Sequence, residues 1–110
     1  MQAKQAAQAV ACFAALAQAT RLAIFRALVQ AGPDGLAAGA IAQILGLAPS
    51  TLSFHLAHLA KAGVVIAAPQ GRQIIYTAGF AQLDWLSHYL LENCCSGRYC
   101  PPAGATKKPC

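Results

Sequence analysis

A chain of 110 residues is expected to form a single domain, and a chain this short often completes the burial of its apolar surface by dimerising. Its net charge is +5, which favours a polyanionic partner, and its only carboxylates are Asp34, Asp84 and Glu92. Paired-carboxylate catalysis and carboxylate-clustered Ca²⁺ or Mg²⁺ sites therefore have almost no residues to build on.

The composition also argues against a membrane protein. Hydrophobic residues make up 57% of the chain, but 26 of its residues are alanine, which favours helices. No apolar run approaches the roughly 18 residues that a spanning helix needs, and residues 1–10 lack the apolar segment of a signal peptide. We therefore expect a cytoplasmic protein with no membrane partner.

Two helices are predicted first along the chain. Apolar residues at helical spacing predict one over residues 5–16, whose low polarity suits packing against a partner subunit. Another is predicted over residues 21–30, with Thr20 as its N-cap and with Arg21 and Arg26 on its outer side. Its predicted buried side consists of Leu22, Phe25, Ala27, Leu28 and Val29.

A helix-turn-helix is predicted next. A short helix over residues 38–45 ends at Gly46. The helix after it begins at Pro49, which suits a first helical turn, and stops at Gly63. At about 100° per residue, three of its leucines form a narrow stripe that can seat the helix on a core. The stripe is Leu52, Leu56 and Leu59.

The opposite side of this helix carries short hydrogen-bonding side chains, as a DNA-reading helix in the major groove does. Ser50, Thr51 and Ser53 are predicted to hydrogen-bond phosphates or base edges. His55 and His58 are weaker candidates for DNA contact, and His55 is equally suited to flank the core with a bond to the backbone. Taken alone, the stretch also fits an ordinary amphipathic surface helix.

Phe54 faces outward among these polar residues, which is unusual for a phenylalanine. One interpretation is that it contacts a thymine methyl group in the major groove. The other is that it fills a gap between helices. Lys61 is expected to act through the charge of the DNA backbone rather than through base readout.

A β-hairpin is predicted directly after the reading helix. Residues 64–68 and 74–77 are β-prone, and the turn between them has Gly71 at its tip. Arg72, next to that glycine, is predicted to bind DNA by reaching a phosphate or the minor groove. A helix-turn-helix followed by a hairpin makes a winged helix.

The last predicted helix covers residues 80–93 and is apolar over a wide arc, so we expect it to pair with the first helix across a two-fold axis. The predicted fold is mainly α with a β-hairpin wing, a homodimeric winged helix-turn-helix. Residues 1–93 would form the DNA-binding and dimerisation domain, and residues 94–110 a cysteine-containing tail.

Several segments in this order resemble the ArsR/SmtB family of metal-responsive repressors. They are residues 17–25 (AQATRLAIF), 50–59 (STLSFHLAHL) and 62–65 (AGVV), followed by Gly71-Arg72 and Ile75-Tyr76. The resemblance covers roughly residues 5–93 and implies a dimeric repressor that leaves its double-stranded operator DNA when an ion binds.

One departure from the family pattern matters. The arsenic site of the founding type is a Cys-x-Cys pattern at the start of the reading helix or just before it. Residues 40–50 of this chain contain no cysteine, so ion sensing must take place elsewhere.

The candidate ion site is the group Cys94, Cys95 and Cys100 at the end of the last predicted helix. Three thiolates suit a soft trigonal ion such as As(III) or Sb(III), whereas Zn²⁺ usually takes four ligands. Arg98 would help to stabilise the thiolates. The resemblance agrees, because some family members carry such a C-terminal cysteine group for arsenite.

Other thiols leave alternatives open. Cys94 and Cys95 alone would suffice for an organoarsenical with two open bonds, and Cys110 is a possible substitute for Cys100. Cys12 lies inside the apolar first helix and is expected to be a small buried residue. The alternative is that it approaches the C-terminal site of the partner subunit.

A zinc site on the last helix is a further hypothesis, since Asp84, His88 and Glu92 share one helix face and the resembled family has such a site there. The spacing differs from the family pattern and a second histidine is missing, so an exposed stripe with local pairing is the favoured interpretation.

The sequence therefore predicts a repressor with As(III) or Sb(III) as inducer and no organic cofactor. A thiol redox sensor or a zinc-responsive repressor on the same fold is the alternative. A cysteine-dependent enzyme is disfavoured, because neither a carboxylate nor a glycine-rich site accompanies the cysteines.

Overall fold

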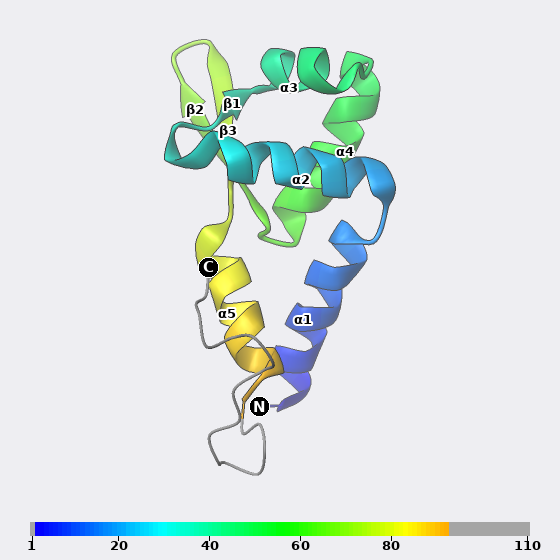
Figure 1. Cartoon of the computed structure of the whole chain (residues 1–110), viewed down its shortest axis with the longest axis vertical. Helices are drawn as coiled ribbons and strands as arrows, with labels where there is room; N and C mark the ends of the chain where they lie inside the picture. Colours follow the sequence, from blue (N-terminus) through cyan, green and yellow to red (C-terminus); the bar gives the residue numbers. More distant parts are fainter. Residues whose placement is uncertain (1, 93–110) are drawn as a thin grey trace, which may run out of the picture.

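The computed structural model describes residues 2–92, which form a winged helix body with two further helices extending from it (Figure 1). Cys94, Cys95, Cys100 and Cys110, together with the rest of the predicted tail, lie outside the described residues. The elements are α1 (Gln2–Leu16), α2 (Ala19–Ala31), the 3-10 turn η1 (Gly32–Asp34), β1 (Leu36–Ala37), α3 (Ala38–Leu45), α4 (Pro49–Lys61), β2 (Val65–Gln70), β3 (Gln73–Ala78) and α5 (Phe80–Leu90).

The wing is a three-stranded antiparallel sheet in the order β1-β3-β2. Strands β2 and β3 pair from Val65↔Ala78 to Gln70↔Gln73, which confirms the predicted hairpin. Gly71 closes the turn at φ 64°, a conformation that glycine adopts without strain. Strand β1 was not predicted, because two residues are too few to show a strand period.

The hydrophobic core lies where α2, α3, α4 and the base of the wing meet, and buried residues of α1 and α5 extend it. The predicted leucine stripe of α4 is confirmed, because all three leucines are buried. The largest fully buried side chains are Ile24, Leu28, Ile41, Leu52, Leu59, Val64, Val65 and Cys12.

The buried face of α2 was predicted wrongly in part. Leu22 and Val29 are exposed, and the face is centred on Ile24 and Leu28 instead. Because Leu22 precedes Ile24 by two residues, the two side chains point about 160° apart on a helix. When a helix has apolar residues on all sides, its sequence does not show which side is buried.

The start of α2 also differs from the prediction. Gln18, not Thr20, is the N-cap, and its side-chain oxygen accepts a hydrogen bond from the Arg21 N–H at 2.9 Å. The Arg21 side chain is half-buried rather than fully outside, since its Nε donates to the Ala15 carbonyl at 2.6 Å. Arg21 therefore ties the end of α1 to the first turn of α2.

Helices α1 and α5 lie beside each other below the winged body (Figure 1), and Gln8 of α1 donates a hydrogen bond to Gln82 of α5 at 3.0 Å. Helix α5 ends at Leu90, three residues before the predicted end, at a place where neither glycine nor proline marks a boundary in the sequence. Both helices expose large apolar side chains, namely Val10, Phe13, Phe80 and Leu90, and Leu91 directly after α5 is exposed as well.

Within residues 2–92, no single helix is long and apolar enough to cross a membrane, although two neighbouring helix pairs, bent by 98° and 113°, reach that length and apolarity together.

The chain turns from the wing into α5 at a very close backbone approach. The Gly79 N–H donates to the Val64 carbonyl at 2.8 Å. A methyl group on Gly79 would overlap the carbonyl oxygen of Gly63 and crowd Val64. Only a residue without a side chain allows this approach.

We predict that Gly79→Ala lowers the free energy of unfolding by about 2 kcal/mol, since backbone at this site must move to make room for the methyl group. Gly39→Ala is the matched control, because a methyl group there meets nothing within 4 Å and lies in a helix. The control is expected to be neutral or stabilising by up to ~1 kcal/mol. Urea unfolding at one protomer concentration measures both. Equal midpoints for Gly79→Ala and the wild type would contradict the prediction.

Candidate nucleic-acid interface

Helix α4 is held by its buried stripe and leaves its opposite side free. Ser50, Thr51, Ser53, Phe54 and His58 are all exposed, as the sequence predicts. Proline occupies the first turn of α4, and the N-cap Ala48 makes no side-chain cap. The first N–H groups of the helix therefore remain available to an anion such as a phosphate. The placement is confirmed, and DNA contact by each residue stays a prediction.

His55 occupies the flank between the two sides of α4. It is half-buried, and its Nδ1 atom is buried without a hydrogen-bond partner in the described part of the chain. The suggested bond to the backbone is therefore not made through this atom. Its ring contacts Phe54 edge-on, with centroids 5.4 Å apart.

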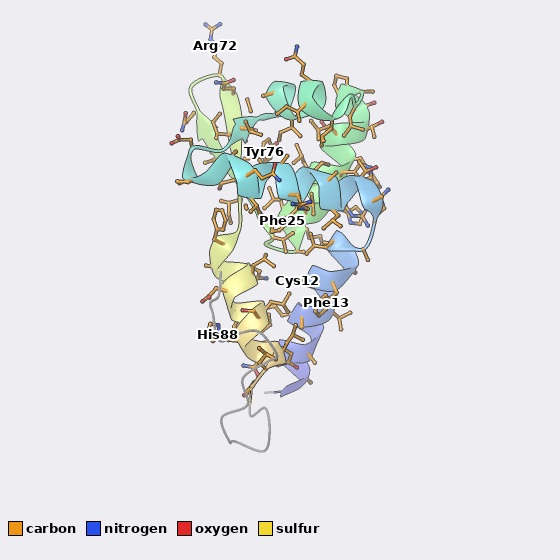
Figure 2. All side chains as sticks on the ribbon, in the orientation of Figure 1. Cys12, Phe13, Phe25, Arg72, Tyr76 and His88 are labelled. Atoms are coloured by element: carbon orange, nitrogen blue, oxygen red, sulfur yellow. The ribbon has the colours of Figure 1, made fainter. Side chains whose placement is uncertain are left out.

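The wing places its basic residue far from the core. Arg72 is exposed at the tip of the β2–β3 hairpin and points away from the body (Figure 2). The hairpin tip and the N-terminal end of α4 lie at the same end of the molecule, opposite to the free ends of α1 and α5 (Figure 1). One elongated ligand at this end of the molecule can therefore contact both elements.

The charges of this surface suit a polyanion. Neither α4 nor the hairpin contains an aspartate or a glutamate, and they carry Lys61 and Arg72. The three carboxylates of the chain lie in η1, in α5 and just after α5. Phosphate oxygens therefore meet cations and hydroxyls without opposing carboxylates on these two elements.

A polar junction joins the C-terminal end of α4 to α1 and α5. The Gln82 Nε2 group donates to the carbonyl of Ala62, the C-cap residue of α4, at 2.9 Å. It also lies 3.3 Å from the Cys12 sulfur, whose thiol donates to the same carbonyl at 3.8 Å. Figure 2 shows Cys12 between the two helices, where it is fully buried as the sequence predicts.

Sequence reasoning missed Gln82, although a signal was present. Gln82 precedes the buried Leu86 by four residues and so shares its helix face. A glutamine on the inner face of an apolar helix needs a hydrogen-bond partner, and here the partner is the end of the reading helix.

Two of the three hypothetical zinc residues, Asp84 and His88, contact each other on α5. His88 Nδ1 lies 2.8 Å from the Asp84 backbone oxygen and 3.6 Å from the Asp84 carboxylate. Both side chains are exposed, and within residues 2–92 no three histidines, cysteines or carboxylates form a group able to hold a metal. This local pairing is the one that the sequence favours over a zinc site.

Comparison with known proteins shows which proteins this chain resembles in sequence and structure. Residues 16–66 match a protein family described as a helix-turn-helix domain. HlyU from Vibrio cholerae is 32% identical, with 79% of this chain and 95% of that chain covered and a TM-score of 0.63. An ArsR-like transcriptional regulator from Rhodococcus sp. RHA1 is 29% identical over 86% of this chain and 85% of its own, with a TM-score of 0.73. The chain belongs to the ArsR family of winged-helix transcriptional regulators.

Other structures agree with this ArsR-family assignment. A winged helix-turn-helix domain from Mycobacterium bovis, a possible ArsR-family regulator described as homodimeric, is 26% identical over 90% of this chain and 92% of its own, with a TM-score of 0.67. A further Vibrio cholerae structure is described as reduced HlyU. No curated protein matches the chain significantly. Residues 16–66 contain both α3 and α4, so the helix-turn-helix is the DNA-binding part of this ArsR-family regulator.

We predict that Gln82→Ala lowers the free energy of unfolding by about 1–2 kcal/mol, since it leaves the Ala62 carbonyl with only the weak thiol donor. Gln43→Ala is the matched control, because Gln43 is exposed on α3. Chemical denaturation at equal protomer concentration measures both variants. If the two variants unfold at the same urea concentration, the junction contributes nothing to stability.

Proposed function

We propose that this ArsR-family regulator is a cytoplasmic homodimeric repressor that releases its operator DNA when trivalent arsenic binds Cys94, Cys95 and Cys100. The observation that supports arsenic sensing is the distribution of thiols. The one cysteine within residues 2–92 is Cys12, which is buried and held in the junction with Gln82. The thiols that remain for an ion follow α5 directly in the sequence.

The chemistry of three thiols suits arsenite. Arsenous acid, As(OH)₃, exchanges its three hydroxyl groups for three cysteine sulfurs and releases three water molecules, with no change of oxidation state. Thiolates select soft ions, and a three-sulfur site lacks the fourth ligand of a usual zinc site. Antimony(III) reacts in the same way, and an organoarsenical with two open bonds needs only two of the sulfurs.

Dimerisation is supported by the surface of α1 and α5. These helices and the residue that follows α5 expose Val10, Phe13, Phe80, Leu90 and Leu91, an apolar set that a partner subunit would bury. The Mycobacterium bovis relative is homodimeric. A two-fold dimer presents two α4 helices to successive major grooves of a two-fold operator.

The junction provides a route from the ion to the DNA. Ion binding after α5 would reposition that helix, and Gln82 connects α5 to the C-terminal end of α4. A shift of α4 changes the spacing of the two reading helices in the dimer and weakens DNA binding. The coupling requires that arsenic binds the DNA-free arrangement more tightly than the DNA-bound one.

A thiol redox sensor on the same fold is the second candidate, with a disulfide among the same cysteines in place of the ion. It is favoured by one observation, namely that a relative 28% identical to this chain is described as reduced HlyU. Disulfide formation needs an oxidant such as peroxide, whereas arsenite binding needs none. A zinc-responsive repressor has no specific support within residues 2–92.

One experiment separates these candidates. The operator is selected from random duplex DNA, and its release from the protein is followed by fluorescence anisotropy with arsenite, antimonite, zinc or peroxide. We expect arsenite to release the DNA and Cys94→Ser to raise the required arsenite concentration at least about tenfold, or ~1.4 kcal/mol of binding free energy. Cys110→Ser is the matched control and keeps the wild-type response.

Three results would overturn parts of the proposal. If peroxide or zinc releases the DNA and arsenite does not, trivalent arsenic is not the inducer. If Cys94→Ser responds to arsenite like the wild type, Cys94 is not part of the arsenic site. If the selection from random duplex DNA enriches no sequence, the protein is not an operator-binding repressor.

A further inference from the structure

Phe54 is an isolated apolar side chain on the DNA-facing side of α4. It is 60% exposed, although burial of a phenylalanine normally stabilises a fold. Its neighbours on this side are the hydroxyls of Ser50, Thr51 and Ser53 and, further along, the ammonium of Lys61. The side chains around Phe54 are therefore mostly polar or basic, with Ala57 as an apolar neighbour.

The geometry of α4 excludes a role for Phe54 in the core of this chain. Phe54 lies two residues from both Leu52 and Leu56, so its side chain points about 160° away from each of these buried leucines. The prediction that it fills a gap between helices is therefore wrong for the described part of the chain. Phe54 also stands apart from the exposed apolar residues of α1 and α5, which dimerisation accounts for.

Neighbouring rings hold Phe54 in place. It contacts His55 and His58 edge-on, with centroids 5.4 Å and 5.3 Å apart and interplanar angles of 65° and 64°. His55 is itself half-buried and so is fixed to the body of the domain. Such contacts limit the rotamers of an exposed ring, so that little entropy is lost when it meets a ligand.

The surface beside Phe54 changes from apolar to cationic within two turns. A hollow of about 260 Å³ runs along α4 and is lined by Phe54, Ala57, His58 and Lys61. A small apolar group fits against Phe54 and Ala57, while Lys61 faces an anion further along. This arrangement matches a base methyl group near a phosphate.

We propose that Phe54 reads the 5-methyl group of a thymine in the major groove and is the main sequence-discriminating residue of α4. Thymine alone among the four bases displays a methyl group there. Serine and threonine hydroxyls donate to and accept from several bases, so Ser50, Thr51 and Ser53 discriminate weakly. This inference rests on the proposed function, since it requires that α4 enters DNA.

The test replaces each thymine of the selected operator by uracil, which removes only the methyl group. For the wild type, we expect one position per half-site at which uracil weakens binding about fourfold, from the transfer free energy of one methyl group. Replacement in both half-sites is expected to weaken binding about fifteenfold, since distant sites add. All other uracil positions should bind like thymine.

Protein variants assign the effect to its residue. Phe54→Ala is expected to bind thymine and uracil operators equally at the sensitive position. Ile44→Ala is the matched control, because Ile44 is also 60% exposed but lies on α3. It should keep the wild-type preference for thymine. Phe54→Leu, which retains apolar volume, should keep part of that preference.

The inference fails if no uracil position weakens wild-type binding, if the selected half-sites contain no thymine, or if Phe54→Ala keeps the full preference. In each of these cases the protein still binds a selected duplex, so the repressor function stands. If no duplex is enriched at all, both the function and the inference fail.

Discussion

Burial of one leucine stripe on α4 is the constraint on which the rest of the arrangement depends. Leu52, Leu56 and Leu59 lie in the core, and at 3.6 residues per turn this places the intervening residues on the outside, except His55, which is half-buried on the flank. The hydroxyls, the basic groups and Phe54 face outward because no inner positions remain for them. The sheet supports the same core through Val65 and Ala78 and extends its basic tip, Arg72, toward the same end of the molecule.

The C-terminal end of α4 is fixed by polar contacts in addition to the burial of Leu59. The Ala62 carbonyl at the C-cap accepts from Gln82 of α5 and from the thiol of Cys12 of α1. Two helices that leave the winged body therefore meet at one backbone oxygen of the reading helix. A hydrogen-bonded junction has a definite geometry, so a displacement of α5 there alters α4 rather than being absorbed by loose apolar packing.

The elements that the sequence reveals are those with a strong local signal. Residues 38–45 were predicted as a helix with the bounds that α3 has, because Gly46 marks its end in the sequence. In the structure Gly46 adopts the left-handed conformation of a helix cap. The outward side of α4 was predicted because its leucines recur at helical spacing. Strand β1 and the inner face of α2 were not, since both are determined by tertiary contacts and not by local pattern.

The candidate site likewise contains residues that local sequence pattern predicts and residues that it does not. Ser50, Thr51 and Arg72 could be placed from the sequence, because helix geometry and turn position suffice for them. The Gln82 junction could not, because it joins residues 20 to 70 positions apart in the chain. The thiols after α5 remain a prediction from composition and family resemblance, and their support is chemical.

In the proposed repressor, DNA reading and ion sensing occur at opposite ends of one chain and are coupled through the Gln82 junction. The most direct test titrates arsenite into the operator complex of Gln82→Ala while measuring both arsenic bound and DNA released. We predict that the DNA-free variant binds arsenic with wild-type affinity, but that its operator complex retains DNA at arsenite concentrations that empty the wild-type complex. Release of DNA by Gln82→Ala at the wild-type arsenite concentration would contradict coupling through this junction.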